Sequence, residues 1–268
     1  MDLKIFDVQH GACALLTCDD DTRMMIDCGQ NAVTGWRPGS YLRHLGISYL
    51  EMLAITNYDE DHVDGLPDLR KSVEIGWLWR NKKVSARQIR NLKSEDGMGP
   101  GIDELVYMIE REYSGSVPSP GPKFLDLRST AFSNSTKDFD DENNLSMALH
   151  LSCHGVGIMF PGDLETTGWL ALLRDENFRS ALRNTHVLIA SHHGRESGIC
   201  PEIFDYCSPY FIVISDKGYM YDTQRTIPYY RTKARGAAFR DESFRRVLTT
   251  RRDGRIGFTF SPRGWGAY

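Results

Sequence analysis

The stretch Met52-Leu-Ala-Ile-Thr-Asn-Tyr-Asp-Glu-Asp-His62 joins a short apolar run to a cluster of polar side chains. The apolar run has the length and hydrophobicity of a buried β-strand. Directly behind it, Asp59, Asp61 and His62 offer two carboxylates and an imidazole within four positions. A divalent metal ion requires such oxygen and nitrogen donors around one point. The stretch therefore predicts a metal site at the edge of a sheet.

Two other apolar runs end in residues of the same kind. The run Ile158-Met-Phe-Pro-Gly-Asp163 ends in a carboxylate, and Val187-Leu-Ile-Ala-Ser-His-His193 ends in a pair of histidines. Each motif alone is more often a solvated turn or a helix cap. Three strand ends in this order, each carrying ligand-type residues, favour a metal site on a rigid sheet edge.

The order of the predicted elements indicates an α/β chain with two sheets. Strands predicted at 3–8, 13–17 and 23–27, separated by tight turns, form an antiparallel meander. Later strands fall into two groups, each followed by helices. We expect a four-layer αββα sandwich, with two mixed β-sheets face to face and helices on both outer faces. No linker divides the chain, so we expect one domain over 1–268, with a helical insertion near 84–115.

Composition narrows the class of protein. The 268 residues are 41% hydrophobic and 25% charged, which excludes collagen-like, coiled-coil and wholly disordered chains. The apolar runs are only a few residues long, so we expect no membrane span and no secretory signal. Six cysteines form no CxxC pair, which argues against a zinc ribbon or a redox motif. We expect a cytoplasmic protein with reduced cysteines.

The C-terminal segment 225–255 is strongly basic although the chain as a whole has a net charge of −4. Ten lysines and arginines stand there against three acidic residues. A basic segment on an acidic body can mark a phosphate-rich partner such as a nucleic acid. A solvated surface with no partner explains the same composition equally well.

Seven motifs in the same order resemble the metallo-β-lactamase superfamily and, more narrowly, the hydrolase domain of ComEC-type DNA-uptake proteins. The resemblance spans nearly the whole chain. It rests on Phe6-Asp-Val-Gln-His-Gly11, Ile26-Asp-Cys-Gly29, Asn57-Tyr-Asp-Glu-Asp-His62, Asn143-Asn-Leu-Ser146, Pro161-Gly-Asp163, Ser191-His-His-Gly194 and Leu248-Thr-Thr-Arg-Arg-Asp-Gly-Arg-Ile256.

The resemblance implies a role for each matched residue. Asp61, His62 and the pair His192-His193 would hold one metal ion, with Asp163 at a bridging position. His193 is the favoured ligand of the pair because it directly precedes a glycine. Asp61 would also act in catalysis by orienting the attacking water. Asp27 would lie behind the ligands and orient them through hydrogen bonds.

The departures from the superfamily pattern weaken a second metal position. Asn57 and Asp59 stand where the pattern has histidines, and Asn144 and Ser146 stand near the place of a third. Amide and hydroxyl oxygens bind zinc poorly and suit harder ions such as Mn²⁺ or Mg²⁺. We therefore expect a divalent metal, zinc or manganese, in one well-formed site and a doubtful second one. The other histidines are interpreted as ordinary structural or surface residues: His10, His44, His150, His154 and His186.

These residues together predict a metal-dependent phosphodiester hydrolase, most simply a nuclease acting on DNA or RNA through a metal-activated water. Arg195 and Lys217 would neutralise phosphate oxygens, while Tyr219 and Tyr221 would stack on bases. One alternative is a small-molecule phosphodiesterase acting on a cyclic nucleotide or a phosphorylated head group. Another is a degenerate member of the fold that serves as a binding or regulatory module, which Asn57 favours. The sequence names no protein partner.

Overall fold

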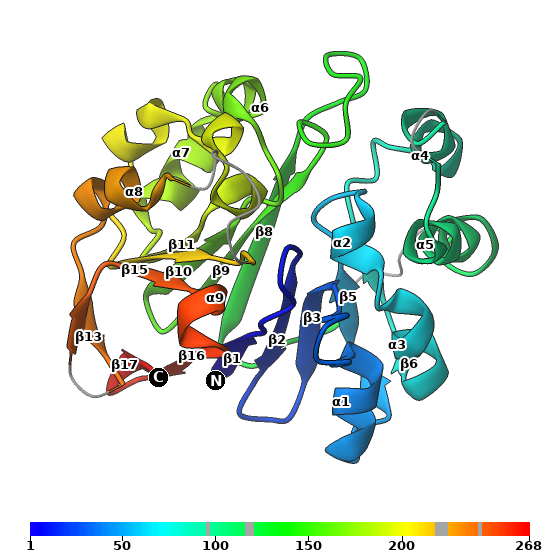
Figure 1. The fold of residues 1–268 in the computed structure, drawn as a ribbon, viewed down its shortest axis with the longest axis horizontal. Coiled ribbons are helices and arrows are strands. Elements are labelled where there is room, and N and C mark those ends of the chain that lie inside the picture. The colour runs from blue at the N-terminus through cyan, green and yellow to red at the C-terminus, as the bar shows by residue number, and fades with distance from the viewer. Residues whose placement is uncertain (95–96, 116–120, 218–224, 241–242) are drawn as a thin grey trace.

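The computed structural model describes residues 1–94, 97–115, 121–217, 225–240 and 243–268, and Tyr219 and Tyr221 lie outside them. The described chain contains two large mixed sheets (Figure 1). The first has the order β17-β16-β1-β2-β3-β5-β7 and the second has the order β15-β12-β11-β10-β9-β8. Their strands are β1 (Asp2–Ile5), β2 (Cys13–Thr17), β3 (Arg23–Cys28), β5 (Met52–Ala54), β7 (Leu78–Trp79), β16 (Ile256–Ser261) and β17 (Gly264–Ala267) in the first sheet, and β8 (Leu127–Ser133), β9 (Met147–Cys153), β10 (Val156–Phe160), β11 (Val187–Ile189), β12 (Phe211–Ile214) and β15 (Val247–Thr249) in the second.

The direction of the strands changes within each sheet. Strands β1, β2 and β3 pair antiparallel, as the predicted meander requires, whereas β3, β5 and β7 are parallel. In the second sheet β8, β9 and β10 are antiparallel, and β10, β11, β12 and β15 are parallel. Parallel neighbours bring the ends of several strands to one edge, where polar residues after each strand can meet. Two small pairs complete the described strands: β4 (Tyr49–Leu50) with β6 (Glu74–Ile75), and β13 (Ala237–Phe239) with β14 (Ser243–Arg245).

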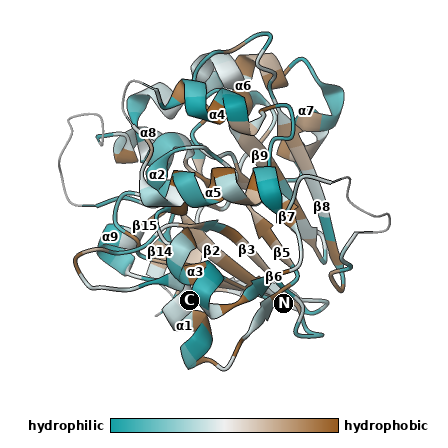
Figure 2. Cartoon of the chain, turned by 90° about the vertical axis from the view of Figure 1, so that its right-hand side faces the viewer, coloured by the Kyte–Doolittle hydropathy of each residue, from teal (hydrophilic) through white to brown (hydrophobic). Residues whose placement is uncertain are grey.

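Helices cover the outer face of each sheet, which confirms the predicted αββα sandwich (Figure 1). The first sheet is covered by α1 (Pro38–His44), α3 (Leu66–Ser72), α4 (Ala86–Leu92) and α5 (Pro100–Arg111). The second is covered by α6 (Thr166–Leu172), α7 (Glu176–Arg183) and α8 (Ile227–Lys233). Two short helices follow strands, α2 (Glu60–Val63) and α9 (Thr250–Asp253). Helices α4 and α5 contain both hydrophilic and hydrophobic residues (Figure 2), and apolar residues such as Ile89 and Leu105 are the buried ones. The two helices occupy the range predicted as a helical insertion.

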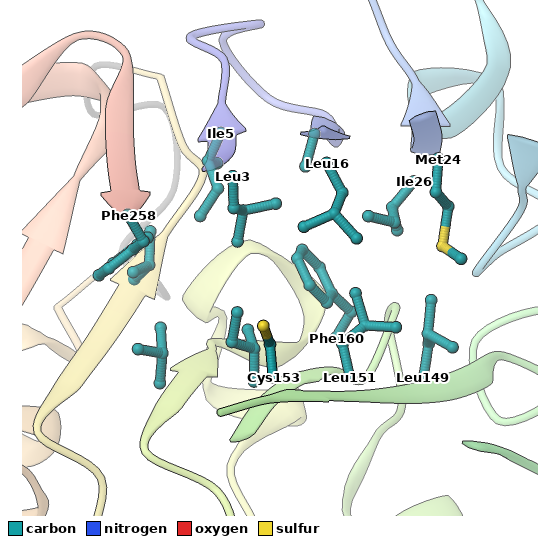
Figure 3. Packing of buried hydrophobic residues seen from close by; sticks show 14 of the residues in the cluster. Leu3, Ile5, Leu16, Met24, Ile26, Leu149, Leu151, Cys153, Phe160 and Phe258 are labelled. Atoms are coloured by element: carbon teal, nitrogen blue, oxygen red, sulfur yellow. The ribbon is translucent and has the colours of Figure 1, made fainter. Parts of the chain in front are cut away.

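Side chains of the first sheet pack into an apolar layer on each of its two faces, because they alternate in direction along each strand. On β3, Met24 and Ile26 face the second sheet, while Met25 packs toward the helices. Side chains of successive strand residues point to opposite faces, so a strand buried on both sides is apolar at every position. Between the sheets, Leu16 and Leu151 are fully buried in the same cluster (Figure 3). Burying a side chain of this size stabilises the fold by roughly 1.5–3 kcal/mol.

The basic C-terminal segment 225–255 contains both helices and strands. Among its described residues, 227–233 and 250–253 are helical, and Gly236, with a φ of +91°, precedes the antiparallel pair β13 and β14. Glycine favours such a left-handed conformation, which stops a helix. In the part of the chain that the structure describes, every helix is too short or too polar to span a bilayer. All six cysteines are free and buried.

Candidate metal centre

The ends of three strands bring metal-ligand side chains together. Among the described residues, two groups have ligand atoms within 4.8 Å of one another, and these are His62 with Asp163 and His193, and His10 with Asp61 and His193. Helix α2 follows β5, Asp163 follows β10, and His193 follows β11. The strand-end positions predicted from sequence therefore converge at one edge of the sandwich.

The distances between the ligand atoms around His193 and Asp163 match the size of a metal ion. His62 Nε2 lies 3.1 Å from Asp163 Oδ1, and His193 Nε2 lies 3.5 Å from Asp163 Oδ2 and 3.3 Å from Asp61 Oδ2. A tetrahedral ion with ligands at about 2.1 Å holds neighbouring ligand atoms about 3.4 Å apart. A cavity of about 30 Å³ is lined by His62, Asp163 and His193, and a volume of roughly that size accepts one ion or one water.

His193 has the hydrogen bonding of a metal ligand. Its Nδ1 donates to the carbonyl oxygen of Ser215 at 3.1 Å, which leaves Nε2 without its proton in the neutral ring. Nε2 is buried and makes no hydrogen bond, although two carboxylates lie near it. Buried polar atoms are nearly always paired. A metal ion at this point would satisfy the orphaned nitrogen, so the donor set fits the ion that the sequence predicts.

His62 is fixed from behind by Asp27 and Thr56. Its Nδ1 lies 3.0 Å from Asp27 Oδ2, and Asp27 also accepts hydrogen bonds from the backbone and the hydroxyl of Thr56. All three residues are buried. A carboxylate behind a histidine orients the ring and sets which nitrogen faces the metal. Asp27 thus lies behind the ligand group, where the sequence predicted it.

Asp163 is held by the loop that precedes it. Its backbone N–H donates to Ser146 Oγ at 3.0 Å, so Ser146 supports Asp163 rather than contributing an oxygen to the ligand group. Gly162 has a φ of +61°, and a Cβ at this position would lie 2.9 Å from Ser146 Oγ. The glycine therefore permits both the left-handed turn and the close approach that aim the carboxylate inward.

Two glycines from the matched motifs lie against the backbone of Asp61. A Cβ at Gly11 would lie 2.6 Å, and one at Gly29 2.5 Å, from the carbonyl oxygen of Asp61. The same oxygen accepts a hydrogen bond from Ala12 N at 3.2 Å. Only glycine allows α2 to approach these turns so closely. The Asp61 side chain is 28% exposed, so it forms the open side of the group.

Charges in this group attract a cation. Burial alone would lower the pKa of His62, but the charges of Asp163 and Asp27 raise it well above its usual value. For His193 burial likewise opposes the carboxylates, which raise its pKa to about 10. Burial would raise the pKa of Asp61, yet its interaction with His193 lowers it to about 2. Protons and metal ions compete for such ligands, so the same field favours a divalent ion.

His10 lies at this site, which corrects its interpretation as an ordinary structural or surface residue. Its ring centroid is 4.3 Å from that of His193, and its Nε2 is 3.8 Å from Asp61 Oδ2. The Arg195 guanidinium donates to His10 Nε2 at 3.0 Å. Burial and the charge of His193 lower the pKa of His10 to about 3, so it accepts that hydrogen bond as a neutral ring. Arg195 thereby occupies the lone pair that His10 would need to bind a metal.

His192 belongs to neither candidate ligand group of the described residues. Its Nδ1 lies 2.9 Å from Ser197 Oγ and its Nε2 accepts from Arg195 at 3.1 Å. Both histidines of the pair are left-handed, with φ values of 49° for His192 and 52° for His193. The structure therefore brings His193, and not His192, to the ligand group among the described residues, in agreement with the preference stated for His193.

The residues predicted near a second metal position have other partners. Asn57 is fully buried, and its Oδ1 accepts from Tyr58 N at 2.6 Å while its Nδ2 donates to Asn143. Asp59 pairs with Lys93 and is in neither ligand group of the described chain. Asn144 Oδ1 accepts from Glu165 N and Gly168 N, so it caps the start of α6. Among the described residues, Asn57, Asp59 and Asn144 therefore make contacts outside the two candidate ligand groups.

Of the four predicted substrate-binding residues, the structure describes Arg195 and Lys217. Arg195 lies at the site, and Lys217 follows Ser215 in the loop after β12. In the basic segment, Arg235 stacks on Tyr210 with 3.8 Å between the guanidinium carbon and the ring centroid. Lys233 lies over Phe204 and Tyr229, and Arg245 pairs with Asp253. Much of the segment's charge therefore has partners within the chain.

Comparisons with known proteins identify the fold. No protein-family model matches the sequence, and no curated protein matches it. Among solved structures, the metallo-β-lactamase fold protein YhfI from Bacillus subtilis is 10% identical and superposes with a TM-score of 0.54, covering 95% of this chain and 99% of its own. A diphosphatase from the PhnP family is 9% identical with a TM-score of 0.46, covering 96% of this chain and 97% of its own. On the likeness to YhfI, this chain has the metallo-β-lactamase fold.

Proposed function

We propose that this protein is a cytoplasmic, metal-dependent phosphodiester hydrolase that cleaves nucleic acid. The observation that carries the proposal is the buried Nε2 of His193, which makes no hydrogen bond and lies within 3.5 Å of two carboxylates, Asp61 and Asp163. His62 completes a set of two nitrogen and two oxygen donors. Such a mixed set suits zinc or manganese.

In this proposal His62, His193, Asp61 and Asp163 hold the ion. When bound, a divalent ion supplies a Lewis acid that polarises a phosphoryl oxygen and lowers the pKa of water toward 7. Asp61, on the open side of the group and ionised at neutral pH, accepts a hydrogen bond from the attacking water and orients it. Arg195 contacts His10, which in turn lies next to Asp61. From this position the guanidinium neutralises charge that develops on the phosphate oxygens.

A nucleic-acid substrate is supported by the resemblance of the motifs to ComEC-type hydrolase domains and by the basic segment 225–255. Small phosphodiesters form the second candidate class of substrate. The observation that favours them is the number of cations in that segment with partners inside the chain, such as Arg235 on Tyr210 and Arg245 with Asp253. A binding module without catalysis is the third candidate, favoured by the engagement of Asn57 and Asp59 in other contacts.

A substrate panel with added Mn²⁺, Zn²⁺ or Mg²⁺ tests the proposal. We expect cleavage of long DNA or RNA, abolished in the double variant Asp61→Ala, His62→Ala. Replacing Arg231, Lys233 and Arg235 together by glutamine should reduce the salt dependence of nucleic-acid binding. A protein that makes fewer phosphate contacts releases fewer counterions when it binds. The metal content should not change.

The outcomes separate the three candidates. Turnover of a dinucleotide-sized ester, indifferent to the triple variant and unaccompanied by cleavage of long strands, would favour the small-molecule enzyme. Protein that binds no metal after supplementation would favour the binding module and contradict the proposed function.

A further inference from the structure

Lys93 is a buried ammonium group held between two carboxylates. It directly follows α4 and is 6% exposed. Its Nζ donates to the carboxylate of Asp59 and to Glu142 Oε1, the latter at 2.8 Å. Lysine is almost never buried unless it is paired. The two ion pairs connect Asp59, Lys93 and Glu142, which are far apart in the sequence. Local sequence patterns do not predict this arrangement.

The lysine lies beside the loop that supplies the metal ligands. Asp59 is the N-cap residue of α2, and Asp61 and His62 are in that helix. On the other side, Glu142 directly precedes Asn143, whose side chain accepts a hydrogen bond from Asn57 at 3.4 Å. The ammonium therefore offsets one of the two negative charges that flank the start of the ligand loop.

The charge on Lys93 is permanent at neutral pH. Burial alone would lower its pKa, but the hydrogen bonds to Asp59 and Glu142 raise it above the usual value. Oxygen atoms from two carboxylates are ligands that a hard divalent ion such as Mn²⁺ would otherwise take. With the ammonium in place, those oxygens are already satisfied by a cation that belongs to the chain.

We propose that Lys93 takes the place of a second metal ion, so that this protein works with a single exchangeable ion and one fixed cation beside it. The proposal rests on the proposed function, because it assumes that the group containing His193 binds a metal. Lys93 is a positioning residue, since it acts through Asp59 and Glu142. It lowers the negative charge on that side of the site from two to one without depending on the supply of a second ion.

Counting bound Mn²⁺ tests the proposal. Purified protein is stripped of metal, titrated with Mn²⁺ alone, and the bound equivalents are read by electron paramagnetic resonance. We expect one equivalent for the wild type and two for Lys93→Met, which keeps the length of the side chain and frees both carboxylates. Lys93→Arg retains the cation and should stay at one. The matched control Lys71→Met, at an exposed lysine on α3, should also stay at one.

A second variant shows which oxygens take the extra ion. Adding Glu142→Gln to Lys93→Met should return the count from two to one. Lys93→Gln, which keeps a hydrogen-bond donor between the carboxylates, should also bind two, and it serves as the test if circular dichroism shows that Lys93→Met is unfolded. A folded Lys93→Met or Lys93→Gln protein with one equivalent, or a wild type with two, would overturn the role of Lys93. A wild type with none would instead contradict the proposed function.

Discussion

His62 Nδ1 lies 3.0 Å from Asp27 Oδ2, and the two residues come from different strand ends of the same sheet. Asp27 is itself in a left-handed conformation, with a φ of 54°, and is held by Thr56 at the end of β5. The relationship fixes the imidazole so that Nε2 faces Asp163. A ligand that is oriented before the ion arrives loses less conformational entropy when it binds.

We expect Asp27→Asn to weaken metal binding by roughly 10–100-fold, the usual cost of losing such a supporting carboxylate. The number of bound ions should not change, because Asp27 is not a ligand. Isothermal titration with Zn²⁺ measures both quantities. Asp20→Asn, at an exposed turn, is the matched control. An affinity equal to that of the wild type would show that Asp27 does not orient the site.

Metal binding should release about two protons per ion at pH 7. In the metal-free protein the pKa of His193 is raised to about 10 and that of His62 is raised well above its usual value, so both rings are protonated on both nitrogens and positively charged at pH 7. The lowered pKa values of Asp61 and Asp163 leave both carboxylates ionised. Titrations in buffers of different ionisation enthalpy count the released protons. Binding that is independent of buffer and pH would contradict this assignment of charge.

The stability of the metal-free protein should fall as the pH rises. The pKa of His193 is about 10 in the fold and about 6.5 in an unfolded chain. A raised pKa stabilises the fold fully below pH 6.5, and the contribution is lost between pH 6.5 and 10. Urea denaturation at several pH values measures this loss. The metal-loaded protein should not show the same decline, because its histidines are already neutral. A metal-free free energy of unfolding that stays level across this range would count against the buried charge.

Gly162→Ala should destabilise the fold more than Gly155→Ala. Both glycines have a positive φ, which costs an alanine about 1–2 kcal/mol. At Gly162 the new Cβ would also lie 2.9 Å from Ser146 Oγ and 3.0 Å from the carbonyl oxygen of Thr56, whereas nothing lies within 4 Å at Gly155. Thermal unfolding of the two variants isolates the contribution of the contact. Equal losses of stability in the two variants would mean that the loop before Asp163 adjusts to the added methyl group with no further loss of stability.

The architecture and half of the site follow from local patterns in the sequence. An apolar run followed by polar ligands predicts a strand end, and parallel neighbours bring such ends together. This reasoning brings His62, Asp163 and His193 to one edge, where the structure has them close together, and it predicts the layers because the strands are apolar on both faces. Such a prediction depends only on the pattern of residues that are close together in the sequence.

Long-range pairings are what the sequence does not reveal. Asp59 has the same chemistry as Asp61, but its partner is Lys93, thirty-four positions later. His10 is a lone histidine in a turn and has no pattern of its own, yet Arg195 meets it from 185 positions away. The signal that could have identified it is the turn Gln9-His-Gly11 between two predicted strands, because Gly11 belongs to a matched motif and docks against Asp61.

The most direct test is an anomalous difference map from crystals grown with Zn²⁺ or Mn²⁺. We predict one strong peak, about 2.0–2.3 Å from His62 Nε2, His193 Nε2 and carboxylate oxygens of Asp61 and Asp163. Lys93 should remain between Asp59 and Glu142, with no peak beside it. A map without a peak at His193, or with its strongest peak between Asp59 and Glu142, would contradict the central claim that this edge of the sandwich is a one-ion metal centre.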